Sequence, residues 1–214
     1  MDYLVDRIVR DVRLALEHDA GDDDLLAYGD TDAASLEAVI ISKVADGARI
    51  VASAAPHHLL DTGVDFTGGI AWDDGVGHGA GYVILPDDFL RLVSFRMSDW
   101  QRPVTEPIKA TDPAYLLQSS PYKGLRGCPE RPVCAIVQRP VGLVLEFYLS
   151  YAQEAYIKQA RYIPMPRISD DSTISICQKC YRPTIMQVAA LTAYALGAET
   201  QGDRMSQLTQ DLLT

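Results

Sequence analysis

Four cysteines are the residues of this sequence most obviously capable of chemistry. Cys128 and Cys134 stand in CPERPVC, and Cys177 and Cys180 stand in CQKC. Two such pairs could supply the four thiolates of a structural zinc site, although five residues separate the first pair and zinc sites usually have two to four. A CQKC pair at a helix start can also be a redox pair, but no thioredoxin-like βαβ pattern surrounds it. We expect free, buried or half-buried thiols without metal, and a small zinc-binding module is the alternative.

The other polar motifs indicate no catalytic site. The adjacent pair His57–His58 cannot share a helix face as two metal ligands, and His78 lies in a glycine-rich stretch. The acidic pairs Asp73–Asp74 and Asp87–Asp88 are also adjacent, so their carboxylates should point apart. The sequence has no GxGxxG after a strand, no GxxxxGK[ST], no HExxH and no GxSxG. We therefore expect no enzyme activity and no cofactor.

Charge and composition narrow the class of partner. A formal net charge of -10 argues against a protein that grips nucleic acid with a basic face. An acidic wall would instead repel phosphates and let DNA slide past, and a merely solubilising surface is the simpler interpretation. The 214 residues suggest one domain or one domain with an insertion. No apolar run is long enough for a membrane span, so we expect no membrane partner. The N-terminal stretch has charges inside its apolar run and is not expected to be a signal peptide, so we expect synthesis in the cytosol.

Helical periodicity is confined to the two ends of the chain. Apolar stripes predict helices over residues 2–18, 31–55 and 175–199 and a short amphipathic helix over 203–213. The middle is rich in glycine, aspartate and short alternating apolar runs, which are typical of strands and turns. The predicted fold class is therefore α+β. Residues 1–56 plus 170–214 form a helical bundle, and 57–169 form an inserted, antiparallel β-rich region with one short helix.

Three features of the insertion are specific enough to predict in detail. Pro86 should end a strand, and a corner at Pro86–Asp88 should lead into a second strand; DDFLRL can form one helical turn there, with Asp87 as its cap. Asp112 should cap a short helix that has Pro113 in its first turn. Residues 133–138 and 143–149 should form a hairpin around a turn at 139–142.

The order of these elements resembles the head–tail adaptor proteins (also called connector or ring proteins) of tailed bacteriophages. The likeness is nearest to the ring proteins of short-tailed phages, including the crAss-like group. It is carried by two N-terminal helices ending in VASAAP, by LPDDFLRLVSFRMSDWQRPV, and by the hairpin PVCAIV…LEFY that leads into ARYIPMP. The last matching feature is the helix around AALTAYALGA with its amphipathic tail. The cysteine pairs are no part of the pattern.

This resemblance implies a structural protein of the virion. Such adaptors form a ring, usually dodecameric, below the portal, where they extend the DNA channel and provide a platform for the next ring or the tail. The implied partners are copies of the same chain, the portal protein and the next ring or tail protein. Genome DNA would pass through the channel without sequence-specific binding. The implied location is the head–tail junction of the virion, after assembly in the host cytoplasm, and another phage tail or stopper protein is the alternative.

Two sets of contact residues follow. The C-terminal helix of related adaptors often reaches the portal, which maps by position onto Arg204, Leu208, Leu212 and Leu213. This helix also has little else in the sequence to pack on, so deletion of residues 200–214 should abolish portal binding. Arginine and aromatic residues dominate interface cores, so we expect contacts to a neighbouring subunit from a second set: Arg91, Arg96, Trp100, Arg126 and Arg131.

Overall fold

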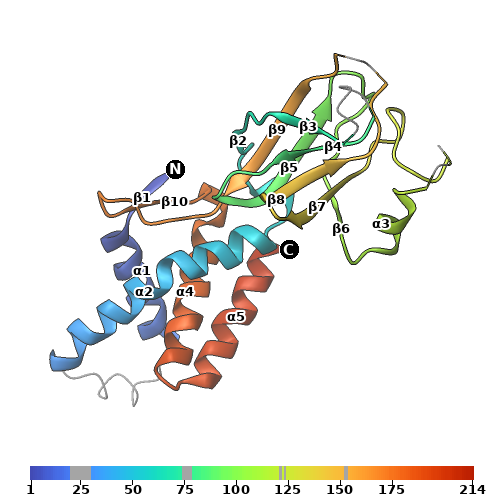
Figure 1. The fold of residues 1–214 in the computed structure, drawn as a ribbon. Coiled ribbons are helices and arrows are strands. Elements are labelled where there is room, and N and C mark those ends of the chain that lie inside the picture. The colour runs from blue at the N-terminus through green and yellow to red at the C-terminus, as the bar shows by residue number, and fades with distance from the viewer. Residues whose placement is uncertain (20–29, 74–78, 121, 123, 152–153) are drawn as a thin grey trace. The chain divides into compact units, whose positions relative to one another are not determined.

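The chain folds into two compact units. The computed structural model describes residues 1–19, 30–73, 79–120, 122, 124–151 and 154–214. The helical unit comprises Met1–Asp61 and Met165–Thr214, and the β unit comprises Thr62–Pro164 (Figure 1). Both boundaries differ by five residues from the predicted division at 56 and 170. Helices at both ends and mostly antiparallel strands in the middle confirm the predicted α+β class.

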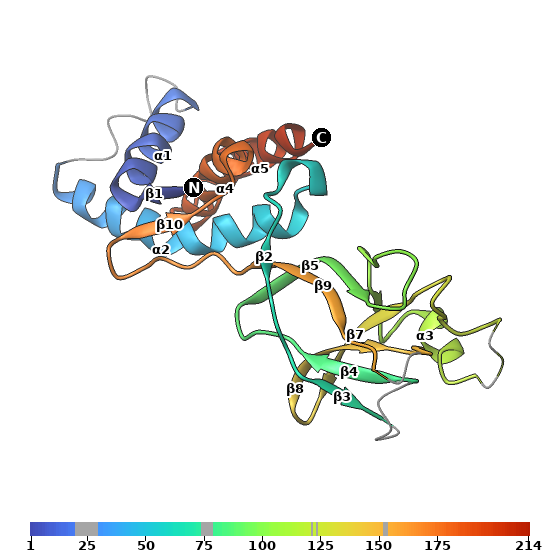
Figure 2. The same cartoon turned by 90° about the horizontal axis from the view of Figure 1, so that it is seen from above.

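In the described part of the helical unit, four α-helices pack around one apolar core. The helices are α1 (Val5–Asp19), α2 (Asp30–Ala54), α4 (Tyr181–Ala195) and α5 (Glu199–Leu213). The central helix, α4, packs against the other three (Figure 2). The core of the helical unit consists mainly of β-branched side chains. Among those that are fully buried are Ile8, Val12, Ile40, Val44 and Val188. The described residues of this unit also form the 3-10 turns η2 (His57–Leu59) and η3 (Gln178–Cys180).

The starts of the first and fourth helices differ from the predictions. The predicted helix over residues 2–18 begins at Val5, because Asp2–Leu4 form strand β1. This strand pairs antiparallel with β10 (Thr173–Ser175), with Tyr3 opposite Ile174. The helix predicted from residue 175 therefore begins only at Tyr181. Pro183 is its third residue, where the missing N–H would have had no partner within the helix.

A glycine sets the distance between α2 and α4. A Cβ atom on Gly47 would lie 2.5 Å from Cγ2 and 3.2 Å from the backbone nitrogen of Val188. The helix propensity of valine is better than that of glycine, but the backbone contact leaves no room for the side chain. We expect Gly47→Val to lower the free energy of unfolding of the helical unit by about 1–3 kcal/mol, measured by chemical denaturation. The control is Ala38→Val, at an exposed position of α2, which should change stability little. Equal stability of the two variants would contradict the close packing of α2 on α4 at Gly47.

The β unit is built from two sheets with an apolar core between them. Strands β2 (Val64–Asp65), β9 (Ile157–Pro164) and β5 (Phe89–Met97) form one sheet in that order. The other has the order β3 (Ile70–Trp72), β4 (Gly81–Ile84), β8 (Gly142–Phe147), β7 (Cys134–Arg139) and β6 (Ile108–Lys109). All neighbours are antiparallel except β6 and β7. The core contains Phe66, Val83, Leu92, Phe95, Trp100 and Phe147.

Two of the three detailed predictions for this unit are confirmed. The hairpin is formed by β7 and β8, whose last pair is Arg139 opposite Gly142. Helix α3 (Pro113–Leu117) is capped by Asp112, whose Oδ1 accepts a hydrogen bond of 2.8 Å from the Ala114 N–H. The third is confirmed in part: strands β4 and β5 flank a corner at Pro86–Asp88, but DDFLRL forms no helical turn. The Phe89 N–H closes a tight turn onto Pro86 O at 2.9 Å, and β5 begins at Phe89 because pairing with β9 outweighs local helix propensity.

Candidate interaction surfaces

Trp100 and Arg96 are held by their own chain. Trp100 is only 2% exposed, and its Nε1–H donates to Leu149 O at 3.0 Å. The prediction that Trp100 contacts a neighbouring subunit is therefore corrected, because its indole is part of the core of the β unit. Arg96 is half-buried and donates from Nε and Nη2 to the carbonyl oxygens of Trp100 and Gln101. Arg91 is also half-buried on β5.

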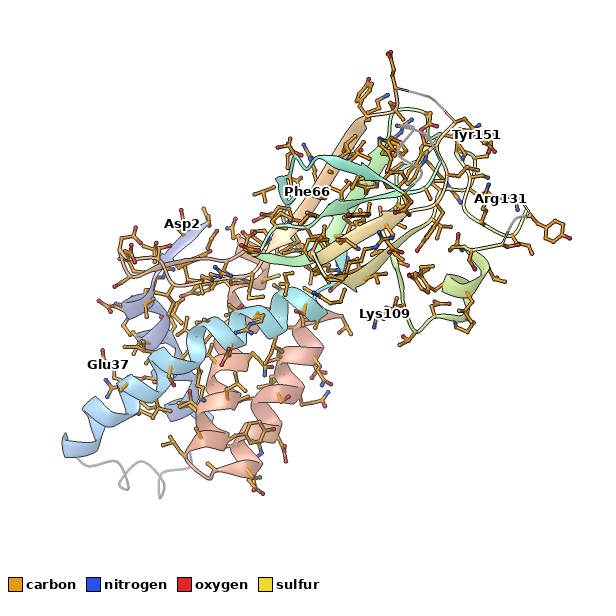
Figure 3. The ribbon with its side chains drawn as sticks, in the orientation of Figure 1. Asp2, Glu37, Phe66, Lys109, Arg131 and Tyr151 are labelled. Carbon is orange, nitrogen blue, oxygen red and sulfur yellow. The ribbon has the colours of Figure 1, made fainter. Side chains whose placement is uncertain are left out.

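Arg126 and Arg131 lie on a loop segment where several large apolar side chains are exposed to solvent. We call residues 110–133, which carry α3 outside the two sheets, the α3 excursion (Figure 1). Figure 3 shows Arg131 exposed on it. Arg126 is half-buried and its Nε has no hydrogen-bond partner among the described residues. The exposed apolar side chains of the excursion are Leu116 (75%), Tyr122 (72%), Leu125 (52%) and Leu117 (46%). Such a mixture of leucine, tyrosine and arginine is typical of a protein contact surface.

The C-terminal helix presents one face to the core and another to solvent. Met205 and Thr209 are buried, and Gln201 Nε2 donates to Leu16 O at 2.9 Å. The expectation that this helix has little to pack on is therefore wrong. The predicted portal-facing residues also divide. Arg204, Leu208 and Leu212 are exposed, whereas Leu213 packs against the helical core.

An apolar groove lies beside the exposed face of α5. Its volume is about 370 Å³, and α1, α4 and α5 all contribute to its walls. Leu14 is 58% exposed and Leu208 is 45% exposed. The two methionines of the lining can adapt to different partners, because their side chains are unbranched and flexible. The lining consists of Asp11, Leu14, Ala15, Ile185, Met186, Met205 and Leu208.

Glu146 is the centre of a buried polar network that sequence reasoning missed. Its side chain is 6% exposed. Oε1 accepts from Arg139 Nε at 2.7 Å, and Oε2 accepts from the hydroxyls of Tyr115 at 3.1 Å and Tyr148 at 3.2 Å. Arg139 also donates to Asp73 Oδ1 at 3.2 Å. Arg139 therefore neutralises a buried carboxylate.

The electrostatics of this network indicate a structural role. Burial raises the pKa of Tyr148 far above its ordinary value, and the neighbouring carboxylate of Glu146 adds to the shift. The pKa of Tyr115 is raised by the same two causes in the same order. Both hydroxyls therefore stay protonated and keep donating at neutral pH. Both carboxylate oxygens of Glu146 are occupied by hydrogen bonds. Because Glu146 lies on β8 and two of its partners lie on α3 and β7, the network joins these three elements.

The four cysteines are divided between the two units. Cys128 and Cys134 belong to the β unit, and Cys177 and Cys180 belong to the helical unit. Cys177 Sγ donates to Leu59 O at 2.8 Å, and burial raises the pKa of Cys180 to about 11. Within the described ranges, no group of three or more histidine, cysteine or acidic side chains could hold a metal ion. His78 and Asp74 lie outside the described residues.

Comparison with known proteins identifies no relative, so the exposed surfaces of the two units are the main guide to function. No protein-family model matches the chain, and no curated protein matches its sequence. In the part of the chain that the structure describes, every helix is too short or too polar to cross a bilayer.

Proposed function

We propose that the chain is the subunit of a head–tail adaptor ring of a tailed bacteriophage. The ring would consist of copies of this chain, dock on the portal protein, extend the DNA channel and receive the next ring or the tail. The subunit would act as a structural protein without catalysis or a cofactor. The resemblance in element order motivates this proposal, and the exposed surfaces support it.

One observation carries the proposal: each unit exposes its own apolar surface. The β unit has Leu116, Leu117, Tyr122 and Leu125 on the α3 excursion. The helical unit has Leu14 and Leu208 at the groove and Leu212 one turn further along α5. A ring subunit contacts its two neighbours through two different patches and needs a further surface for each protein above or below it. Clustered exposed leucines are costly in a monomer and are explained when other subunits cover them.

The negative net charge of the chain agrees with a channel that DNA passes through rather than with a protein that binds DNA. The formal charge is -10, and a ring multiplies this charge by the number of its subunits. A predominantly acidic channel would repel the phosphates and let the genome slide.

Ring formation is tested with the α3 excursion. We expect the purified chain to form a ring with one defined mass by light scattering and in negative-stain images. Leu116→Glu, which puts a charge at a 75% exposed position, should reduce the mass to that of a monomer and leave the circular dichroism unchanged. Thr111→Glu is the control, because Thr111 is exposed on the same excursion outside the apolar cluster. A wild-type chain that stays monomeric at high concentration would refute the ring.

Docking is tested in the same experiment by adding the portal protein encoded in the same genome. Deletion of residues 200–214 is a poor test, because it would remove Met205 and Thr209 from the core. Leu208→Glu should instead prevent co-migration with the portal while the ring stays intact. Gln210→Glu adds the same charge at another exposed position of α5 and should still dock. Undiminished docking of Leu208→Glu would exclude this face as the portal surface.

A further inference from the structure

A second groove, entirely within the β unit, opens where two paired strands separate. Strand β2 pairs with β9 as far as Phe66, whose N–H donates to Ala160 O at 3.0 Å. The chain then leaves β9 and crosses to the other sheet, where Gly68 packs so closely on Val83 that a Cβ would lie 2.5 Å from Cγ1. The space left between the two segments has a volume of about 770 Å³. Its walls are residues 65–68 and 156–161, with Ile70 and Arg96.

One wall of this groove is an incompletely paired strand edge. In the register of β5 with β9, Arg96 lies opposite Gln159 and Met97 lies opposite Ile157, so Lys158 is a bulged residue without a partner on β5. On the other side, no backbone hydrogen bond between described residues joins 67–69 to 156–159. An exposed edge of this kind can accept an added strand from another chain. The bulge limits the added strand to a short segment, so side-chain contacts must provide much of the affinity.

The side chains of the groove favour an acidic partner. Three cations, Arg96, Lys158 and Arg161, line it together with one carboxylate, Asp65, which leaves two net positive charges. Asp65 is already paired with Arg161 Nε at 2.7 Å. Arg96 donates to the carbonyl oxygens of Trp100 and Gln101, and bonds to neutral carbonyl groups leave its positive charge in place. This positive site stands out in a chain whose net charge is -10, and long-range attraction to a carboxylate would help a partner to find it.

The same groove also offers apolar contacts. Phe66, Ile70 and Ile157 contribute to its walls, and Tyr156 is 62% exposed at one end. In an extended segment, successive side chains point to opposite sides. A segment that alternates acidic and apolar residues could therefore place its carboxylates toward Lys158 and Arg161 and its apolar side chains toward Phe66 and Ile157.

We propose that this groove is a docking site for a short, extended, acidic segment of a partner protein, which adds along the edge of β9 at residues 157–159. This inference is independent of the adaptor-ring proposal, because the groove is complete within one β unit.

The test uses the full chain and two fluorescein-labelled ten-residue peptides. One alternates glutamate with valine, and in the other every glutamate is replaced by lysine. We expect fluorescence anisotropy to show binding of the acidic peptide only. Lys158→Glu should weaken this binding about fivefold to tenfold, because it replaces an attraction with a repulsion. Lys109→Glu is the matched control, because Lys109 is exposed on the same unit and is well separated in Figure 3 from Phe66, which lines the groove. The Lys109→Glu variant should bind the acidic peptide as tightly as the wild-type chain does.

Several results would overturn the proposal. These are equal binding of both peptides, no binding of the acidic peptide at millimolar concentration, or an equal loss of binding in the two variants. Tighter binding of a single-stranded DNA oligonucleotide than of the acidic peptide would also overturn it, since the cations would then serve phosphates. If the chain self-associates and Lys158→Glu abolishes both association and peptide binding, the proposal holds and the partner is a second copy. Wild-type-like melting of Lys158→Glu, expected because Lys158 is exposed, excludes misfolding as the cause.

Discussion

Replacing Trp100 with alanine should lower the free energy of unfolding of the β unit by about 3–5 kcal/mol. The indole packs edge-to-face on Phe95 and Phe147, with ring centroids 5.7 Å and 6.4 Å away. Alanine would leave a cavity among these rings and would leave Leu149 O without its hydrogen bond. Denaturation followed by far-ultraviolet circular dichroism and by hydrogen exchange of the β unit measures the loss.

The control for Trp100→Ala is Tyr122→Ala, which removes an aromatic ring that is 72% exposed. This variant should change stability by about 0.5 kcal/mol or less. The original expectation of a subunit contact at Trp100 makes the opposite prediction. If it were right, Trp100→Ala would weaken assembly and leave the stability of the isolated subunit unchanged.

Replacing Glu146 with leucine should cost about 3 kcal/mol, the low end for breaking a buried pair, because the partly buried guanidinium of Arg139 loses one of its two carboxylate partners and keeps only Asp73. The hydroxyls of Tyr115 and Tyr148 would also lose their acceptor. Hydrogen exchange should show the loss first in α3 and the β7–β8 hairpin, which the network joins.

Two further variants separate charge from packing at Glu146. Glu106→Leu, at an exposed position of the same unit, should be nearly neutral. The double variant Arg139→Met with Glu146→Leu removes both charges and should recover part of the lost stability, because no buried ion remains unpaired; Asp73, which also loses its partner, is 45% exposed to water. A double variant less stable than Glu146→Leu alone would mean that Arg139 stabilises the unit mainly through Asp73 and through its contact with the ring of Tyr82.

Elements determined by local sequence were predictable, and elements determined by distant partners were not. The α3 cap at Asp112 and the β7–β8 hairpin depend on neighbouring residues, and the structure confirms both. Strand β1 reads as the first turn of a helix, because only its partner β10, about 170 residues away in the sequence, makes it a strand. The same reason explains the misread turn after Pro86, where pairing with β9 decides the conformation.

The interaction surfaces were less predictable than the fold. Tryptophan and arginine are both common in interfaces, so residue type alone made Trp100 and Arg131 equally plausible contacts. The structure separates them, because Trp100 is buried and Arg131 is exposed. Glu146 stands in an apolar strand sequence, LVLEFYL, and a lone acidic residue there could have signalled a buried, paired carboxylate. The identity of its partners required the tertiary structure, because Tyr115 and Asp73 come from other parts of the chain.

The pairing of β2 with β9 has an evolutionary consequence. Val64 lies opposite Tyr162, so the two strands by which the chain enters and leaves the β unit are neighbours in one sheet. A unit whose ends are adjacent can be inserted into a loop of a host fold, or exchanged for another, without rerouting the host chain. The β unit is thus organised as a cassette. Related chains could acquire new recognition surfaces by replacing residues 62–164 as a block while they inherit the helical unit unchanged.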